Sequence, residues 1–227
     1  MRERAFFGML RDECIPNKRG VDWALDIGCG AGWLLKRLAK AGWLIEGVEW
    51  NKEAAELAAS RTGAKVFDGD VMSLDLETQK YQLIVLSHVI EHLFEPNAVI
   101  KRIHDLLAPG GRAVLFLPNI ESADAKYYKQ FWFHLDAPRH VNFPTASYLR
   151  KLAAKHGFAS ASIRSVAAEW TWKNSKAYQL REHPSECQPS LSVRERLQFQ
   201  LSRVRNVFGS FNGSELIVVL KKKGLEG

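Results

Sequence analysis

The alternation of short apolar runs with segments of helical periodicity constrains the fold of this chain more than any other feature. Valine, isoleucine and leucine dominate the runs, which is typical of parallel strands buried on both faces. The predicted strands span residues 23–27, 44–49, 64–68, 81–87, 112–117, 159–166 and 215–220. The predicted helices span residues 32–41, 52–60, 97–107 and 145–156. This order predicts an α/β, doubly wound, Rossmann-like sheet of seven mostly parallel strands, with the last strand antiparallel.

Two segments interrupt this alternation. Residues 119–144 are rich in aromatic side chains and are expected to be an irregular loop, and residues 169–213 form an insertion before the last strand. A chain of 227 residues can build one core, so we interpret residues 1–227 as a single domain. No apolar run approaches the roughly 20 residues needed to cross a bilayer, and no signal peptide is recognised. These features favour a cytoplasmic location.

Cysteine number and net charge exclude some classes of protein and leave others open. Cys14, Cys29 and Cys187 are odd in number and far apart, which argues against a disulfide framework and against a zinc-binding pair. The formal charge of +7 favours contact with anions. Nucleic acid, an acidic membrane surface and a phosphorylated substrate all fit, so charge alone does not choose among them.

Three glycines lie between the first predicted strand and the first predicted helix. Gly28, Gly30 and Gly32 allow a tight turn and let a ligand approach the backbone without a Cβ in the way. A plain β–α turn can have the same composition, so the glycines alone do not decide. Trp33 stands where the dinucleotide-binding fingerprint has its third glycine, which disfavours a nicotinamide dehydrogenase.

Acidic residues lie at or just after the carboxyl ends of three predicted strands, at the edge where open α/β sheets bind ligands. Asp26 is expected either to orient the glycine turn or to accept from a cationic amino group. Glu49 lies 19 residues past Gly30 and can accept hydrogen bonds from two ribose hydroxyls. Asp70 is expected to hold an adenine amino group, while the side chains that pack on the adenine ring are expected to be those of Trp50 and Val71. Together with the glycine turn, these residues predict a nucleoside site.

These motifs, taken together, resemble those of the class I S-adenosylmethionine-dependent methyltransferases. The resemblance rests on Leu25-Asp26-Ile27-Gly28-Cys29-Gly30-Ala31-Gly32, on Glu49 and Asp70, on Ser87-His88-Val89-Ile90-Glu91-His92-Leu93 and on the turn Pro109-Gly110-Gly111. It covers about residues 20–166. The resemblance implies S-adenosyl-L-methionine as cofactor, S-adenosyl-L-homocysteine as product, and methyltransferase activity.

A second, shorter resemblance concerns the molecule that would accept the methyl group. The chain is similar to small-molecule O-methyltransferases of ubiquinone biosynthesis and of sugar or polysaccharide tailoring, and residues 135–143 resemble one such subgroup. This implies methylation of a quinone-like or sugar-like small molecule on oxygen. Two alternatives stay open: an RNA methyltransferase, suggested by the basic charge, and a protein that binds S-adenosylmethionine without turnover. Because no RNA-binding module and no Asn-Pro-Pro-Tyr-like motif is present, no nucleic-acid partner is expected. The oligomeric state stays open.

The segment from His88 to His92 spells His-x-x-Glu-His, which formally matches an inverted zinc-peptidase motif. His88 falls at a predicted strand end, where a shared helical face for both histidines is not expected, so no metal site is predicted. Ser87 and His88 are instead expected to line the reactive end of the cofactor. The alternative is that both histidines cap the loop, with Glu91 and His92 as a structural pair.

The aromatic loop at residues 119–144 carries the remaining candidate site residues. A loop crowded with aromatic and charged side chains can cover a substrate and exclude water. His134 and Arg139 are predicted to contact the acceptor. His140 is the first choice of general base, with His88 the second catalytic candidate, because a neutral histidine suits proton abstraction near pH 7. A loop that packs only on itself is the alternative.

The insertion at residues 169–213 contains an amphipathic pattern. The apolar residues at helical spacing are Val193, Leu197, Leu201, Val204 and Phe208, and the basic residues among them are Arg194, Arg196, Arg203 and Arg205. The favoured interpretation is a helix whose apolar side packs on the body and whose basic side faces solvent. A dimer contact or lid, and a membrane-surface helix that serves a lipid-linked substrate, are the alternatives.

Overall fold

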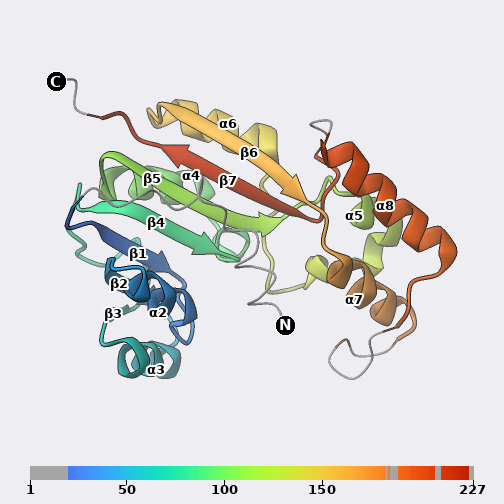
Figure 1. The fold of residues 1–227 in the computed structure, drawn as a ribbon, viewed down its shortest axis with the longest axis horizontal. Helices are drawn as coiled ribbons and strands as arrows, with labels where there is room; N and C mark the ends of the chain where they lie inside the picture. Colours follow the sequence, from blue (N-terminus) through green and yellow to red (C-terminus); the bar gives the residue numbers. More distant parts are fainter. Residues whose placement is uncertain (1–19, 182–183, 185–188, 208–210, 225–227) are drawn as a thin grey trace.

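The computed structural model describes residues 20–181, 184, 189–207 and 211–224 (Figure 1). The expectations for Cys14, Cys187 and Phe208 lie outside these residues. In the described part, seven strands form one sheet in the order β3-β2-β1-β4-β5-β7-β6. Their bounds are β1 (Trp23–Ile27), β2 (Leu44–Glu49), β3 (Lys65–Asp68), β4 (Tyr81–Ser87), β5 (Leu107–Pro118), β6 (Ser160–Val166) and β7 (Glu215–Lys221). β7 pairs antiparallel with both β5 and β6, and the other neighbouring strands of this sheet pair in parallel, so the predicted fold class is confirmed.

Helices cover both faces of the sheet because successive strand residues point to opposite sides. The helices that follow the strands are α2 (Trp33–Lys40), α3 (Lys52–Thr62), α4 (Pro96–Leu106) and α6 (Ala146–Lys155). On one face Ala24 packs with Leu34 of α2, whereas on the other Leu25 belongs to the core that contains Ile100 of α4 and Leu149 of α6. All four helices were predicted within two residues of these bounds.

The ends of two helices follow from single side chains. Asn51 accepts a hydrogen bond from the Ala54 amide at 2.9 Å and so caps the start of α3. Thr145 accepts one from the Tyr148 amide and caps α6 as the sequence predicts. Gly63 has a φ of 69°, a left-handed conformation that ends α3 without steric cost.

The segment Pro109-Gly110-Gly111 was predicted as a turn before the fifth strand, and this prediction was wrong. The strand β5 already begins at Leu107 and contains all three residues. The Gly110 amide donates to the Lys223 carbonyl at 2.9 Å, and the Lys222 amide donates to the Gly111 carbonyl at 2.9 Å. These bonds keep the segment in the sheet, and the irregularity appears as a register shift between Tyr81 and Leu83 of β4.

The aromatic stretch at residues 119–144 is more regular than predicted. It contains the helix α5 (Ala123–Tyr128) and two 3₁₀ turns, η2 (Lys129–Phe131) and η3 (Phe133–Leu135). Ser122 caps α5 by accepting from the Ala125 amide at 3.1 Å. A helix of six residues is too short to show apolar periodicity, which explains why the sequence pattern did not indicate it.

A side lobe lies beyond the carboxyl ends of β4, β5 and β6 (Figure 1). It consists of α5 with α7 (Glu169–Gln179) and α8 (Val193–Val207). Its own apolar cluster includes Tyr128, Trp132 and Trp172, together with Phe199 of α8. The buried Asp124 carboxylate ties the lobe together, because it accepts from Trp132 Nε1 at 3.2 Å and from Thr171 Oγ1 at 2.9 Å. Among the described helices, none is long and apolar enough to cross a bilayer.

The orientation of α8 differs from the favoured interpretation. Its apolar residues Val193, Leu197, Leu201 and Val204 point outward and are 86%, 58%, 39% and 54% exposed. The side that faces the lobe carries the buried residues Glu195, Phe199 and Ser202 instead. Polar contacts of Glu195 hold this side of α8 against the lobe. Its carboxylate accepts from Tyr128 Oη, Lys176 Nζ and the Ser192 amide. The prediction that the apolar side packs on the body was therefore wrong.

Candidate active site

The glycine turn between β1 and α2 is fixed by the neighbouring strand. The amides of Gly28 and Cys29 both donate to the Val48 carbonyl of β2, at 2.7 and 3.1 Å. Gly28 has a φ of 72°, and a Cβ added there would overlap Val89 Cγ2. Gly32 has a φ of 79°, and its Cβ would lie 3.0 Å from the Ala58 Cα of α3. The fold itself therefore requires glycine at both positions.

Gly30 differs from the other two glycines. Its φ of 51° is also left-handed, but no atom of the residues that the structure describes lies within 4 Å of the position that a Cβ would take. Its amide donates to Glu49 Oε2 at 2.8 Å. The turn therefore leaves open space directly over the Gly30 backbone, beside a buried carboxylate. This is the geometry that a ligand in van der Waals contact with the main chain needs.

Glu49 ends β2 and is only 6% exposed. Its two carboxylate oxygens are held separately, because Oε2 accepts from the Gly30 amide at 2.8 Å and Oε1 accepts from the Asn51 amide at 3.0 Å. A carboxylate has about four lone-pair sites, so each oxygen keeps capacity for one more donor. Glu49 is thus oriented in advance and can accept from a pair of hydroxyl groups.

Asp26 lies on β1 directly before the glycine turn and is 3% exposed. Burial raises the pKa of its carboxyl to about 8, and the negative charge of Glu49 adds to the shift. Two acidic groups thus lie close together where little water reaches them. A cationic ligand group placed beside them is favoured electrostatically, and it would return Asp26 to its charged form.

The turn after β3 brings Asp70 to the same edge of the sheet. The Gly69 amide donates to the Glu49 carbonyl at 3.0 Å, which joins the ends of β2 and β3. Asp70 is exposed, and its Oδ1 accepts from the Met72 amide at 3.0 Å. Val71 is buried at 3% exposure in the core with α4, whereas the Trp50 ring is 83% exposed. Of the two predicted ring contacts, Trp50 thus has the larger free surface.

His88 follows β4 and lies between two buried carboxylates. Its Nδ1 lies 3.1 Å from Glu91 Oε1, and its Nε2 lies 3.6 Å from Glu215 Oε2. Glu91 is 0% and Glu215 2% exposed, while the His88 side chain is 38% exposed. The His88 backbone has a φ of 54°, a strained conformation for a residue with a side chain, and such strain is often found at functional sites. Ser87, the last residue of β4, is half-buried beside it.

His134 belongs to the same cluster. Its Nε2 lies 3.2 Å from Glu215 Oε1, and its ring stacks on that of His88 with 6.0 Å between centroids. Trp170 of α7 contacts the His134 ring from another side, at 5.4 Å. The Phe133 amide donates to Ser175 Oγ at 2.9 Å, which fixes the turn η3 against α7. The side lobe therefore forms a wall of the cluster.

His140 and Arg139 lie farther along the same loop. His140 Nδ1 lies 2.6 Å from the His134 carbonyl, and its Nε2 lies 3.7 Å from Asp136 Oδ2. Burial lowers the pKa of the His140 imidazole, which keeps it neutral. Arg139 donates to Asp136 Oδ1 at 2.7 Å, and its side chain is 73% exposed. Among these loop residues, His134 is in direct contact with His88, and Arg139 lies at the surface.

The His-x-x-Glu-His pattern does not form one helical face. Only a short 3₁₀ turn, η1 (Ile90–His92), follows the left-handed residue His88. Glu91 pairs with His88, and its Oε2 has no hydrogen-bond partner in the part of the chain that the structure describes. The potential ligand atoms of Glu91, His92 and His140 lie within 4.8 Å of one another. Because each of the two ring Nδ1 atoms contacts a backbone carbonyl, these side chains are held in place without an ion.

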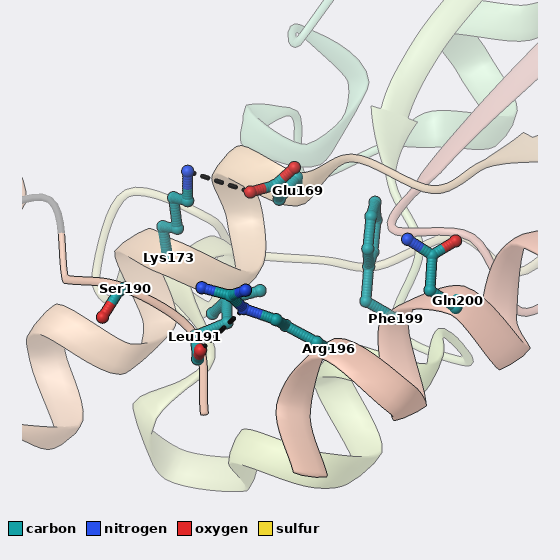
Figure 2. A pocket seen from close by; sticks show the side chains of 7 residues that line it. All are labelled: Glu169, Lys173, Ser190, Leu191, Arg196, Phe199 and Gln200. Atoms are coloured by element: carbon teal, nitrogen blue, oxygen red, sulfur yellow. Dashed lines mark hydrogen bonds and ion pairs between the residues drawn. The ribbon is translucent and has the colours of Figure 1, made fainter. Parts of the chain in front are cut away.

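A separate pocket of about 340 Å³ lies within the side lobe (Figure 2). Its lining residues come from α7, α8 and the segment before α8: Glu169, Lys173, Ser190, Leu191, Arg196, Phe199 and Gln200. Two of them form an ion pair along α7, with Lys173 Nζ 2.9 Å from Glu169 Oε1. The helix α7 therefore has two sides, one toward this pocket and one, through Trp170, toward the histidine cluster.

Residues 4–163 match the family model described as a methyltransferase domain. This match covers more than half of the chain and agrees with the sheet order. The chain belongs to this family of methyltransferase domains, and its sheet order is that of the class I S-adenosylmethionine-dependent methyltransferase fold.

Individual relatives are more distant. The chain is 30% identical over 101 residues to a ubiquinone biosynthesis O-methyltransferase of Coxiella burnetii, and the match spans 42% of each chain. In fold it is similar to a phosphoethanolamine N-methyltransferase of Haemonchus contortus, with a TM-score of 0.65, 16% identity, and coverage of 97% of this chain and 52% of the other. A geranyl diphosphate C-methyltransferase of Streptomyces coelicolor gives a TM-score of 0.66 at 14% identity, covering 98% and 79%. At these identities the structures show a shared fold alone.

Proposed function

We propose that this chain methylates a small molecule on oxygen, with His88 as the general base. The observation that supports it best is the position of His88, which is held by buried Glu91 and lies next to Val89, the residue packed on Gly28 of the glycine turn. His88 therefore offers an imidazole with one nitrogen oriented and a partly exposed side chain, next in sequence to a residue that contacts the glycine turn. The names of the relatives describe methylation of oxygen, nitrogen and carbon, so these relatives do not identify the acceptor atom. The proposal of an oxygen acceptor rests on His88 and its two carboxylate partners instead.

The cofactor half of the site is proposed to hold the three parts of S-adenosylmethionine. The ribose hydroxyls donate to the two Glu49 oxygens, each charge-assisted bond contributing about 1.5–3 kcal/mol. Asp26, ionised by the contact, accepts from the amino group above the glycine turn formed by Gly28, Gly30 and Gly32. The adenine amino group donates to Asp70 while Trp50 and Val71 pack on the ring, and Ser87 lies toward the sulfonium end.

The bound cofactor supplies a methyl group that is already activated on sulfur, so the protein aligns the acceptor and manages one proton. As the oxygen–methyl bond forms and the sulfur–methyl bond breaks, His88 takes the hydroxyl proton. Glu91 holds Nδ1–H, so Nε2 is the basic nitrogen, and both carboxylates stabilise the imidazolium that results. Alignment of this kind can reduce a barrier by roughly 7–11 kcal/mol.

The loop at residues 119–144 is proposed to cover the acceptor, and residues 169–213 to complete its wall within the single domain. His134 contacts the acceptor beside His88, and Arg139 contacts a part of it that reaches the rim. The contacts of His140 favour a positioning role, because its Nδ1 binds the carbonyl of His134 and its Nε2 faces Asp136. His88 has partners on both nitrogens as well, but its side chain is 38% exposed whereas that of His140 is 8% exposed, so His88 is preferred as the base.

The test measures S-adenosylhomocysteine formation with a panel of phenols, catechols and sugar hydroxyls, alongside calorimetry with S-adenosylmethionine and NAD. We expect micromolar binding of S-adenosylmethionine, no binding of NAD, and turnover with at least one hydroxyl acceptor. Binding without turnover across the panel would identify a non-catalytic binding protein. Turnover with RNA alone would favour the nucleic-acid alternative and contradict the proposal.

A further inference from the structure

The outer side of α8 is an apolar stripe with no described segment packed against it. The stripe consists of Val193, Leu197, Leu201 and Val204, all of them exposed. Isolated exposed aliphatic residues are common, but four of them aligned on one helix face are not explained by the fold. Figure 1 shows α8 at the periphery of the side lobe, with α5 and α7 on its inner side. The stripe therefore belongs to the accessible surface of the described structure.

Helical spacing places the stripe opposite the side that holds α8 in the fold. At 3.6 residues per turn, positions 193, 197 and 204 coincide within about one-eighth of a turn. Positions 195, 199 and 202, which are Glu195, Phe199 and Ser202, lie on the far side of the helix and are buried. An exchange of the two sides would bury the stripe and expose Glu195, yet Glu195 is bound by Tyr128, Lys176 and Ser192. The outward direction of the stripe is thus enforced by the lobe.

Positive charge borders the stripe on both sides. Arg194 and Arg205 lie along one border, and Arg196 and Arg203 lie along the other, all four exposed. The acidic residue of α8 is Glu195, which is buried on the inner side. Apart from Arg196, which also lines the pocket of the side lobe, Arg194, Arg203 and Arg205 thus flank four aliphatic side chains, and no carboxylate of α8 lies beside them. This pattern matches a helix that lies in the interface of an anionic bilayer.

Other occupants fit this surface less well. A second copy of α8 on a two-fold axis would bring the arginines of both copies together with no exposed carboxylate of α8 between them. A nucleic-acid backbone would satisfy the arginines but leave the aliphatic stripe in water. We propose that α8 docks on an anionic phospholipid surface, with the stripe in the acyl boundary and the arginines at the phosphates.

The position of α8 gives this docking a route to the active site. α8 packs on α7 through Phe199 and Trp172, whose rings are 6.3 Å apart. α7 in turn places Trp170 against His134 of the histidine cluster. Docking through α8 would therefore hold the acceptor wall next to the lipid headgroups. The inference does not depend on the acceptor assigned above, because lipid binding is measured without turnover.

The experiment measures co-sedimentation of the full chain with vesicles. Vesicles of phosphatidylglycerol and phosphatidylcholine in equal parts are compared with pure phosphatidylcholine vesicles. We expect sedimentation with the anionic vesicles that decreases with salt, and at least about tenfold weaker binding for Leu197→Asp/Val204→Asp and for Arg203→Gln/Arg205→Gln. Leu57→Asp is the matched control, because Leu57 is a leucine of α3 that is 43% exposed outside the lobe. Its binding should equal that of the wild type.

Circular dichroism and S-adenosylmethionine affinity show whether each variant retains the fold, and Leu197→Ser/Val204→Ser replaces the aspartate variant if that one unfolds. The proposal is overturned if the wild type does not sediment with anionic vesicles, or if the stripe variants bind as the wild type does. A solution dimer that Leu197→Asp dissociates would also overturn it, since α8 would then be a protein interface.

Discussion

His88 Nδ1 lies 3.1 Å from Glu91 Oε1 in a turn that the left-handed backbone of His88 makes possible. The two residues are three positions apart in the sequence, so their contact is local, but Glu215 approaches the same imidazole from β7. The histidine is thus oriented by one carboxylate from its own turn and a second from the far end of the chain. Contact with two buried carboxylates, Glu91 and Glu215, therefore distinguishes His88, the proposed base.

Replacement of His88 by alanine tests its proposed role. We expect kcat to decrease about 10²–10⁴-fold, the range for a general base, with S-adenosylmethionine affinity close to that of the wild type. His140→Ala should lower kcat less, because its nitrogens contact the loop itself. His156→Ala, at the end of α6, is the control. Equal turnover by the His88 variant and the wild type would remove His88 as the base.

The raised pKa of Asp26 predicts that cofactor binding is linked to proton release. Below a pH of about 8 the carboxyl is protonated in the ligand-free protein, and the cationic amino group favours its charged form. Binding should therefore release a proton and become tighter as the pH rises toward about 8. Calorimetry in buffers of different ionisation enthalpy measures this release. Asp26→Asn should abolish it, and a wild-type enthalpy that is independent of the buffer would contradict the assignment.

The same shift has a consequence for stability. Since the pKa of Asp26 is higher in the folded chain than the usual 3.8, the fold gains stability from this group while it is protonated. That contribution is complete below a pH of about 3.8, decreases as the pH rises from 3.8 to about 8, and is lost above it. The Tm of the ligand-free wild type should thus decline over this range relative to Asp26→Asn. Parallel Tm curves for the two proteins would be evidence against the shift.

The glycine turn allows a test that separates folding from binding. Gly28→Ala should lower the free energy of unfolding by about 1–3 kcal/mol, because the added methyl overlaps Val89 in a left-handed conformation. Gly30→Ala meets open space and should cost only the conformational strain of about 1 kcal/mol. Its main effect should be weaker S-adenosylmethionine binding. Urea unfolding and calorimetry measure the two effects, and an unchanged Kd for Gly30→Ala would place the cofactor elsewhere.

Glu49→Gln tests the proposed ribose contact. The amide keeps the size of the side chain but removes the charge and one acceptor, so the Kd for S-adenosylmethionine should rise about ten- to hundredfold. Glu56→Gln, an exposed residue of α3, is the control for a surface carboxylate. If both variants bind as the wild type does, Glu49 serves only to hold the Gly30 amide.

Local patterns in the sequence predicted the parts of this molecule that depend on neighbouring residues. The buried strands, the capped helices and the glycine turn all follow from periodicity and from the special properties of asparagine, threonine and glycine. Glu215 was missed because its partners His88 and His134 are more than 80 residues away and a strand-end glutamate has no local signal. The side of α8 that packs inward was also mispredicted, since the partners of Glu195 come from α5 and α7.

The place of β7 in the sheet has a consequence for how the enzyme is made. β7 inserts between β5 and β6 and brings Glu215 to the edge where β4 ends. A nascent chain on the ribosome can form the glycine turn and the Glu49 contact early, while β5 and β6 still lack the strand that joins them. The contacts of His88 and His134 with Glu215 can form only after β7, which ends at residue 221, has emerged. A chain cut before β7 should therefore retain the residues of the cofactor half and lack methyl transfer.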